Sequence, residues 1–111
     1  MPLCTFHTNL PKERVPHDLH KQISDLISKI LDKPEAKVTV IVHPDTQMCR
    51  GGSDDPTCML EIWSIGVFSA EKNPKYSGPI YQFVKEKLEI AEDKIVIVYH
   101  DLKAEELAKP N

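Results

Sequence analysis

The sequence lacks the features that mark several common classes of protein. No apolar run approaches the roughly 20 residues of a membrane-spanning helix, and we expect no signal peptide because the N-terminus has no apolar core. The net charge is −3 and the pI is about 5.9, which argues against binding to nucleic acids or insertion at anionic membranes. With 28% charged and 41% hydrophobic residues, the composition predicts one globular domain over 1–111.

Cysteines are few, and their spacing argues against the usual cysteine frameworks. The chain has three, Cys4, Cys49 and Cys58, and no two are spaced as C-x-x-C. A disulfide framework or a structural zinc site is therefore not expected. Cys4 and Cys58 lie in apolar, strand-like segments, so we expect them to pack as small hydrophobic side chains with reduced thiols.

Local catalytic motifs are also missing. The chain contains no G-x-S-x-G, P-loop, G-x-G-x-x-G or H-E-x-x-H sequence. His17 and His20 are three residues apart on an expected helix and could both reach one metal ion. No third ligand is apparent, so an exposed helix face explains them better and we predict no metal site.

A repeat organises the chain. LDKPEAKVTVIVH (31–43) and LEIAEDKIVIVYH (88–100) align at an offset of 57 residues, which matches His43 with His100. Each copy ends a helix-like segment and enters a β-branched strand. Apolar residues at helical spacing between Val15 and Leu31 predict the first helix, with Pro16 in its first turn. The second is expected to start late, or to hold Pro79 in its opening turn.

Apolar runs at 3–8 and 58–66 precede the two helices, so the order is strand–helix–strand, twice. We predict an α/β (α+β) fold in which two β-α-β units, related by a pseudo-twofold axis, form a four-stranded mixed sheet with both helices on one face. The strand sequences TVIV and VIVY are apolar on both faces. The uncovered face therefore predicts self-association in a closed ring, and the alternative is a monomer with a solvated sheet face.

Three positions are candidates for chemistry. If Met1 is removed, Pro2 becomes a secondary amine that burial could keep neutral, and thus a general base; otherwise it merely suits the start of a strand. Lys33 could hold a substrate carboxylate, or simply complement the helix C-terminus. Ser64-Ile65-Gly66 could let a small ligand approach the backbone, or simply end a strand.

In order and spacing, these residues resemble the macrophage migration inhibitory factor and D-dopachrome tautomerase family of the tautomerase superfamily, with a leaning to the D-dopachrome tautomerase branch. The segments that carry the resemblance are Pro2, TNLP (8–11), RVP (14–16), Lys33-Pro34, GGSDDP (51–56), SIG (64–66) and Tyr99-His100-Asp101.

The resemblance implies a homotrimer and cofactor-independent keto–enol tautomerisation of phenylpyruvate-like or dopachrome-like aromatic substrates. Pro2 would then move the proton, Lys33 would bind the substrate, and Ser64 and the backbone N–H of Ile65 would orient it. The resemblance also implies a cytoplasmic protein that can be exported without a signal peptide and act as a cytokine on a cell-surface receptor.

The chain departs from that family at four places. Val96 and Val98 stand where an adjacent subunit usually contributes Tyr and Asn to the pocket, and the tail at 103–111 is short and charged. Thr57 and Leu60 replace the C-x-x-C pair of some relatives, and Val67 follows SIG as in the D-dopachrome branch. The valines and the tail favour an alternative function, a cytokine-like binding protein with vestigial turnover.

Overall fold

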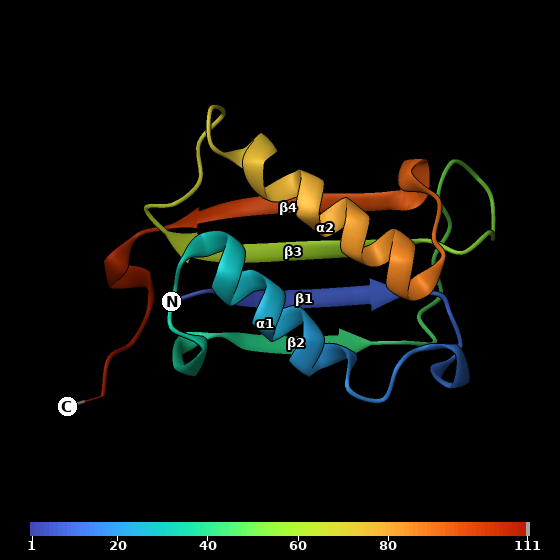
Figure 1. Ribbon diagram of the computed structural model, residues 1–111, viewed down its shortest axis with the longest axis horizontal. Coiled ribbons are helices and arrows are strands. Elements are labelled where there is room, and N and C mark those ends of the chain that lie inside the picture. The colour runs from blue at the N-terminus through green and yellow to red at the C-terminus, as the bar shows by residue number, and fades with distance from the viewer. Residues whose placement is uncertain (111) are drawn as a thin grey trace.

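The computed structural model describes residues 1–110 and confirms the predicted order of elements. Strand β1 (Leu3–Thr8), helix α1 (Leu19–Leu31) and strand β2 (Thr39–His43) form the first unit. Strand β3 (Cys58–Ile65), helix α2 (Asn73–Leu88) and strand β4 (Ile95–Leu102) form the second. The strands make one four-stranded sheet in the order β2-β1-β3-β4 (Figure 1).

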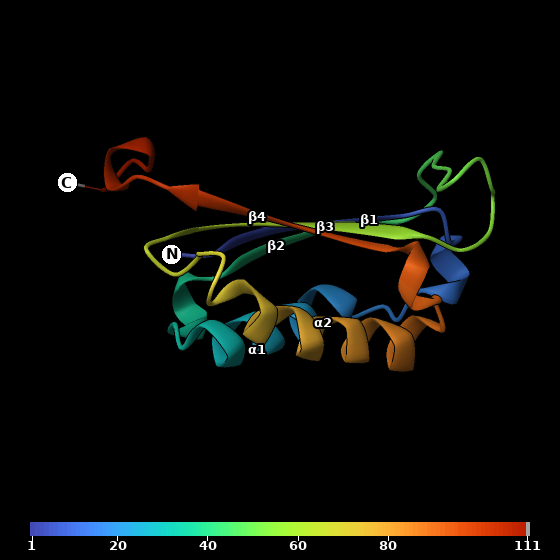
Figure 2. The same ribbon diagram turned by 90° about the horizontal axis from the view of Figure 1, so that it is seen from above.

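Both helices cover the same face of the sheet, as predicted (Figure 2). Strands β1 and β2 are parallel, β3 and β4 are parallel, and β1 and β3 run antiparallel in the centre, which gives the two units their pseudo-twofold relation. Alternate residues of β1 and β3 are buried, because side chains along a strand point to opposite faces. The buried side chains of these strands pack against one face of each helix, including Ile27 of α1 and Val84 of α2.

The helix boundaries correct two predictions. Helix α1 begins only at Leu19, so Pro16 precedes it and accepts a hydrogen bond from the Leu19 N–H (3.1 Å). Helix α2 begins at Asn73, well before the predicted start, and Pro79 lies inside it. Its first turns are fixed by tertiary contacts, since the Tyr76 hydroxyl donates to the Val67 carbonyl (2.7 Å). These contacts outweigh the general preference of proline for helix ends.

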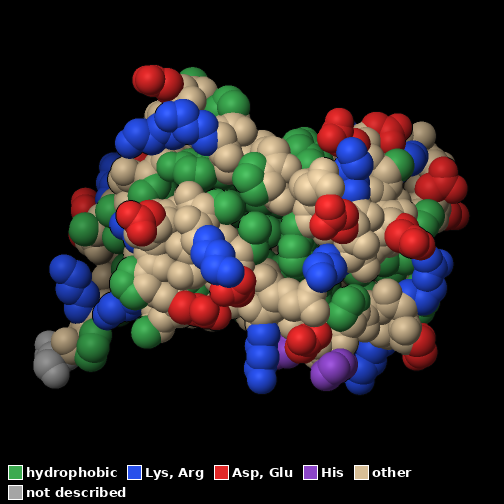
Figure 3. Space-filling model, viewed as in Figure 1, with side chains coloured by type: hydrophobic (Ala, Val, Ile, Leu, Met, Phe, Trp, Pro, Cys, Tyr) green, Lys and Arg blue, Asp and Glu red, His purple; other side chains and the backbone are tan. Residues whose placement is uncertain are grey.

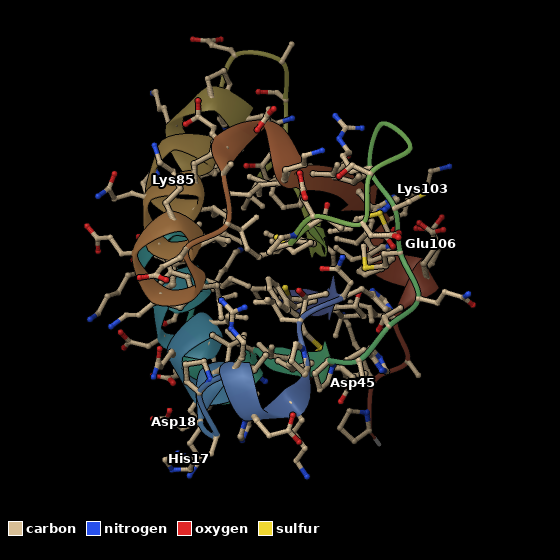
Figure 4. All side chains as sticks on the ribbon, turned by 90° about the vertical axis from the view of Figure 1, so that its right-hand side faces the viewer. His17, Asp18, Asp45, Lys85, Lys103 and Glu106 are labelled. Carbon is tan, nitrogen blue, oxygen red and sulfur yellow. The ribbon has the colours of Figure 1, made fainter. Side chains whose placement is uncertain are left out.

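The other face of the sheet carries no helix (Figure 2). We call it the bare face; alternation along the paired strands assigns to it Leu3, Thr5, His7, Thr39, Ile41, His43, Met59, Glu61, Trp63, Ile65, Val96, Val98, His100 and Leu102. The repeat-related histidines make equivalent contacts here, since His43 stacks on His7 and His100 stacks on Trp63, each with ring centroids 4.6 Å apart. The labelled tail residues Lys103 and Glu106 lie on this side of the sheet (Figure 4).

The helix layer forms the opposite face of the molecule (Figure 3). Hydrophobic side chains gather along the groove between α1 and α2, bordered by charged residues (Figure 3). This groove holds a hollow of about 320 Å³ that includes Leu26 and Phe83. Among residues 1–110, no helix is long and apolar enough to cross a membrane.

Self-association through the bare face stays a prediction, and Ile41 offers a direct test. Ile41 is 47% exposed, so Ile41→Glu should lower the free energy of unfolding of an isolated chain only slightly. Against another copy, it would bury an unpaired carboxylate at a cost of about 3–5 kcal/mol. We expect sedimentation velocity to show an oligomer for the unchanged chain and 12.6 kDa monomers for Ile41→Glu. Gln82→Glu, on the exposed surface of α2, is the control, and equal masses for all three proteins would contradict the prediction.

Candidate active site

Pro2 is held at the start of a central strand. Its carbonyl accepts a hydrogen bond from the backbone N–H of Thr39 (3.1 Å), where β2 begins. On the other side, Leu3 lies opposite Trp63, so the register places Pro2 beside Ser64. The Pro2 ring is fully buried. The first residues of the chain are therefore fixed from both sides, although chain termini commonly fray.

The terminal amine of the unprocessed chain belongs to Met1, which is 41% exposed. Burial is the main cause that lowers the pKa of this amine below its ordinary value of 8.0, and the charges of Lys33 and Lys37 lower it further. Both causes act in the same direction, because burial and nearby cations each disfavour the ammonium form. Removal of Met1 would place the free nitrogen on Pro2, one residue deeper in the same surroundings.

Lys33 directly follows α1 in a fixed backbone conformation. Asp32 ends the helix in the left-handed region, with φ 52°. The Lys33 N–H then donates to the Ser28 carbonyl (3.0 Å), and the Ser28 hydroxyl donates to the Lys33 carbonyl (2.6 Å). These bonds direct the half-buried Lys33 toward the N-terminus, with Pro34 just past the helix as predicted.

A cavity of about 550 Å³ lies where the two ends of the chain approach one another. The N-terminus and the tail that follows β4 lie at the same end of the sheet (Figures 1 and 2). The cavity is lined by Met1, Lys33, Pro34, Lys37, Ala108, Lys109 and Pro110. The structure thus brings Lys33 and the N-terminus together. The volume of the cavity is within the range of small-molecule sites.

The Ser64-Ile65-Gly66 segment lies beside Pro2 but does not line this cavity. Ser64 is fully buried, and its hydroxyl has no hydrogen-bond partner within residues 1–110. Gly66 has φ 69°, and its N–H donates to the Asp101 carboxylate (3.2 Å). The left-handed conformation explains why glycine ends this strand, so Gly66 is accounted for without a ligand.

Val96 and Val98 lie away from Pro2 within the chain. They belong to β4 and are in register with Met59 and Glu61 of β3, on the bare face. Strand β3 separates them from β1. If these valines reach a Pro2 pocket, they reach that of another copy.

Two residues of the cavity, Lys37 and Lys109, belong to none of the motifs in the sequence. The repeat aligns Lys37 with Lys94, yet Lys94 donates from Nζ to the Arg50 carbonyl (3.1 Å), whereas Lys37 lines the cavity. The available signal was topological: when β1 and β2 are parallel neighbours, residues just before β2 lie near those just before β1. No sequence pattern predicts the position of Lys109, which lines the cavity because the C-terminal tail passes beside it.

The remaining candidate groups lie away from the cavity at Met1, and His17 and His20 line a separate hollow of about 260 Å³. His17 and His20 are exposed, and the labelled His17 points away from the sheet (Figure 4). In the part of the chain described, no group of three or more His, Cys, Asp or Glu side chains is placed to hold a metal ion. Cys4 and Cys58 are buried, as predicted. Burial raises the pKa of both thiols to about 12, so neither is a nucleophile at neutral pH.

Known proteins resemble this chain over nearly its full length. D-dopachrome decarboxylase of Mus musculus is 36% identical over 110 residues, covering 98% of this chain and 93% of the relative. MIF-like protein mif-2 of Caenorhabditis elegans is 35% identical over 102 residues, covering 92% and 85%.

The fold agrees with these sequence matches. The structure of macrophage migration inhibitory factor from Trichinella spiralis superposes with a TM-score of 0.91 at 28% identity, covering 96% of this chain and 95% of that one. The family model described as macrophage migration inhibitory factor matches residues 1–110. Because that match includes both β-α-β units and the N-terminal proline, the chain belongs to the macrophage migration inhibitory factor family.

Proposed function

We propose that this chain is a cofactor-independent keto–enol tautomerase of the phenylpyruvate or dopachrome type, with Pro2 as the general base after Met1 is removed. One observation carries the proposal: Met1, the residue directly before Pro2, lines a cavity with Lys33, and burial and lysine charges lower the pKa of its amine. A secondary amine that is largely neutral near pH 7 can take a proton without first losing one.

The chemistry is a proton transfer within one substrate molecule. The lone pair of the Pro2 nitrogen removes a proton from the carbon beside the carbonyl. The C–H electron pair forms the enol double bond, and the carbonyl π electrons move to its oxygen. The Pro2 ammonium then returns the proton to that oxygen, so the substrate is isomerised and the amine is regenerated. The reverse sequence converts the enol to the ketone.

Lys33 would hold the substrate carboxylate near this nitrogen. Its backbone is fixed by Ser28, and its ammonium would act on the carboxylate as a point charge. We assign orientation of the carbonyl oxygen to the backbone N–H of Ile65, next to the buried, unpartnered Ser64 hydroxyl. Both positions follow Trp63, opposite the start of β1, which supports a place beside Pro2.

The names of the relatives are compatible with this chemistry. The mouse relative is a D-dopachrome decarboxylase, and loss of CO₂, like loss of a proton, leaves an electron pair that a conjugated carbonyl group can accept. An acid–base group beside a carboxylate-binding cation serves either reaction. We propose tautomerisation because a lysine ion-paired to the carboxylate stabilises that group and so opposes loss of CO₂.

We further propose that the functional unit is a homotrimer of single-domain chains, cytoplasmic and also exported. The helix-free sheet face (Figure 2), which carries Ile41, Val96 and Val98, supports assembly. A cytokine-like protein that binds a cell-surface receptor and retains little turnover is the second candidate. Val96 and Val98 favour it, because two apolar side chains offer a substrate no hydrogen bonds.

Pro2→Gly should lower kcat/KM for phenylpyruvate tautomerisation by roughly a hundredfold or more, the usual contribution of a general base. An alanine inserted before Pro2 should do the same, because it turns the amine into an amide. Intact mass first establishes that Met1 is removed. Pro56→Gly, at an exposed loop proline, is the control. Full turnover by a folded Pro2→Gly variant would refute the proposed base.

The pH dependence should follow the cations beside the amine. Lys33 lowers the pKa of the Met1 amine in the unprocessed chain. We expect it to act in the same direction on the Pro2 amine once Met1 is removed, so Lys33→Met should raise the pKa of Pro2. The base works unprotonated, so the acidic limb of the kcat/KM profile should move to higher pH. Titration of ¹⁵N-labelled Pro2 by NMR measures the same pKa without substrate. Lys21→Met removes an exposed charge near the other end of α1 and should leave it unchanged; an equal or lower pKa in Lys33→Met would contradict the assignment.

The second candidate function predicts that signalling is independent of turnover. The Pro2→Gly protein should then evoke the same receptor-dependent response in cells as the unchanged chain, at equal concentration. The assay compares both proteins with Pro56→Gly. A response that disappears together with tautomerase activity would count against a separate signalling role.

A further inference from the structure

The end of helix α1 carries one hydrogen bond more than termination of the helix requires. Asp32 adopts the left-handed conformation, with φ 52°, and the Lys33 N–H donates to the Ser28 carbonyl (3.0 Å). These two features by themselves terminate an α-helix. In addition, the Ser28 hydroxyl donates to the Lys33 carbonyl (2.6 Å). Ser28 therefore holds both backbone polar groups of Lys33, one through its main chain and one through its side chain.

The equivalent end of α2 shows that a serine is not needed to end a helix in this way. At the offset of 57 residues, the repeat aligns Ser28 with Lys85 and Asp32 with Glu89. Glu89 ends α2 in the left-handed conformation, with φ 55°, and its N–H donates to the Lys85 carbonyl (3.1 Å). The Lys85 ammonium pairs with Glu92 instead (3.6 Å). Both helices thus end alike, and the serine hydroxyl adds its bond at the end of α1.

The backbone of Lys33 is also restricted by the residue that follows it, Pro34. A residue before proline is confined largely to extended conformations, because the proline ring clashes with it in the helical region. The repeat places Ala91 at the position of Pro34, and the buried Ile90 at the position of Lys33. Both restraints, the serine hydroxyl and the proline, therefore occur at the copy of the repeat whose side chain lines the cavity at Met1.

We propose that Ser28 is a positioning residue for Lys33: its hydroxyl fixes the backbone from which the lysine side chain reaches a substrate carboxylate. The inference rests on the proposed function for the role of Lys33, and it gives Ser28 no contact with the substrate. A lysine ammonium is carried on a flexible four-carbon stem, so each backbone torsion that is fixed narrows the region that it samples. Less conformational freedom is then lost when a carboxylate binds. We therefore expect Ser28 to act on affinity and not on proton transfer.

Ser28→Ala tests this role, and α1 should remain folded because alanine is a better helix former than serine. Calorimetry on the full chain, after removal of Met1, measures the Kd of 3-phenylpropionate, which has the ring and carboxylate of phenylpyruvate but no ketone. Ser28→Ala should raise this Kd about threefold to tenfold, which corresponds to the net contribution of one hydrogen bond. Ser28→Thr keeps the hydroxyl and should stay within about twofold of the unchanged chain. Ser24→Ala, one turn earlier on α1, is the control.

Turnover separates positioning of Lys33 from a general loss of structure. With phenylpyruvate, Ser28→Ala should raise KM by a similar factor and leave kcat within about twofold, because an interaction that is equal in the ground state and the transition state affects KM alone. The methyl ester of phenylpyruvate offers Lys33 no carboxylate, so its KM should not change.

An unchanged Kd in Ser28→Ala, no recovery in Ser28→Thr, or an equal rise in KM for the acid and its ester would overturn the role of Ser28. So would the absence of 3-phenylpropionate binding to the unchanged chain at millimolar concentration. The calorimetric result does not depend on the proposed base, because the probe undergoes no proton transfer. The base is judged by turnover of Pro2→Gly, so failure of the positioning role and failure of the proposed function give different results.

Discussion

The pairing of the first strand on both sides is the constraint on which the rest of this structure depends. A chain terminus is usually mobile, so its amine has no fixed surroundings. Here β1 lies between β2 and β3, and the Thr39 N–H holds the carbonyl of Pro2 itself. The Pro2 nitrogen, which becomes the terminal nitrogen when Met1 is removed, is consequently as well placed as a side chain on a strand. A proline suits this position because the missing N–H is needed by neither ladder.

The fixed terminus gives meaning to charges that would otherwise be ordinary surface lysines. An exposed lysine contributes little alone, because water and salt screen it. Lys33 and Lys37 matter because, after burial, their charges lower the pKa of the terminal amine of Met1. If Pro2 is the base of the processed chain, as we propose, the cations that attract a carboxylate also favour its neutral form. Substrate binding and base activation thus have a common electrostatic origin.

The strands, the helices and their arrangement in one sheet could be predicted from the sequence, because short-range hydrophobic patterns and the repeat reflect them directly. The apolar run at 3–8 predicted β1 with its observed bounds, Leu3–Thr8. The repeat predicted the two β-α-β units of the sheet. The start of α2 was predicted wrongly because proline statistics describe an isolated helix, whereas Tyr76 is anchored by the Val67 carbonyl. Lys37 was missed because its position depends on strand order, which no local pattern encodes.

The bare face and the cavity would both contribute to ligand recognition in an assembly of several copies. Val96 and Val98 point out from β4 on the bare face, so a second copy that covers this face would contact them. Valine offers no hydrogen bond, so such a wall selects a ligand by shape alone. Discrimination between anions then falls on the lysines of the chain that contributes Pro2. The apolar substitution at one end of the sheet and the lysines at the other are therefore complementary: the first reduces polar recognition by a neighbouring subunit, and the second supplies it within the chain.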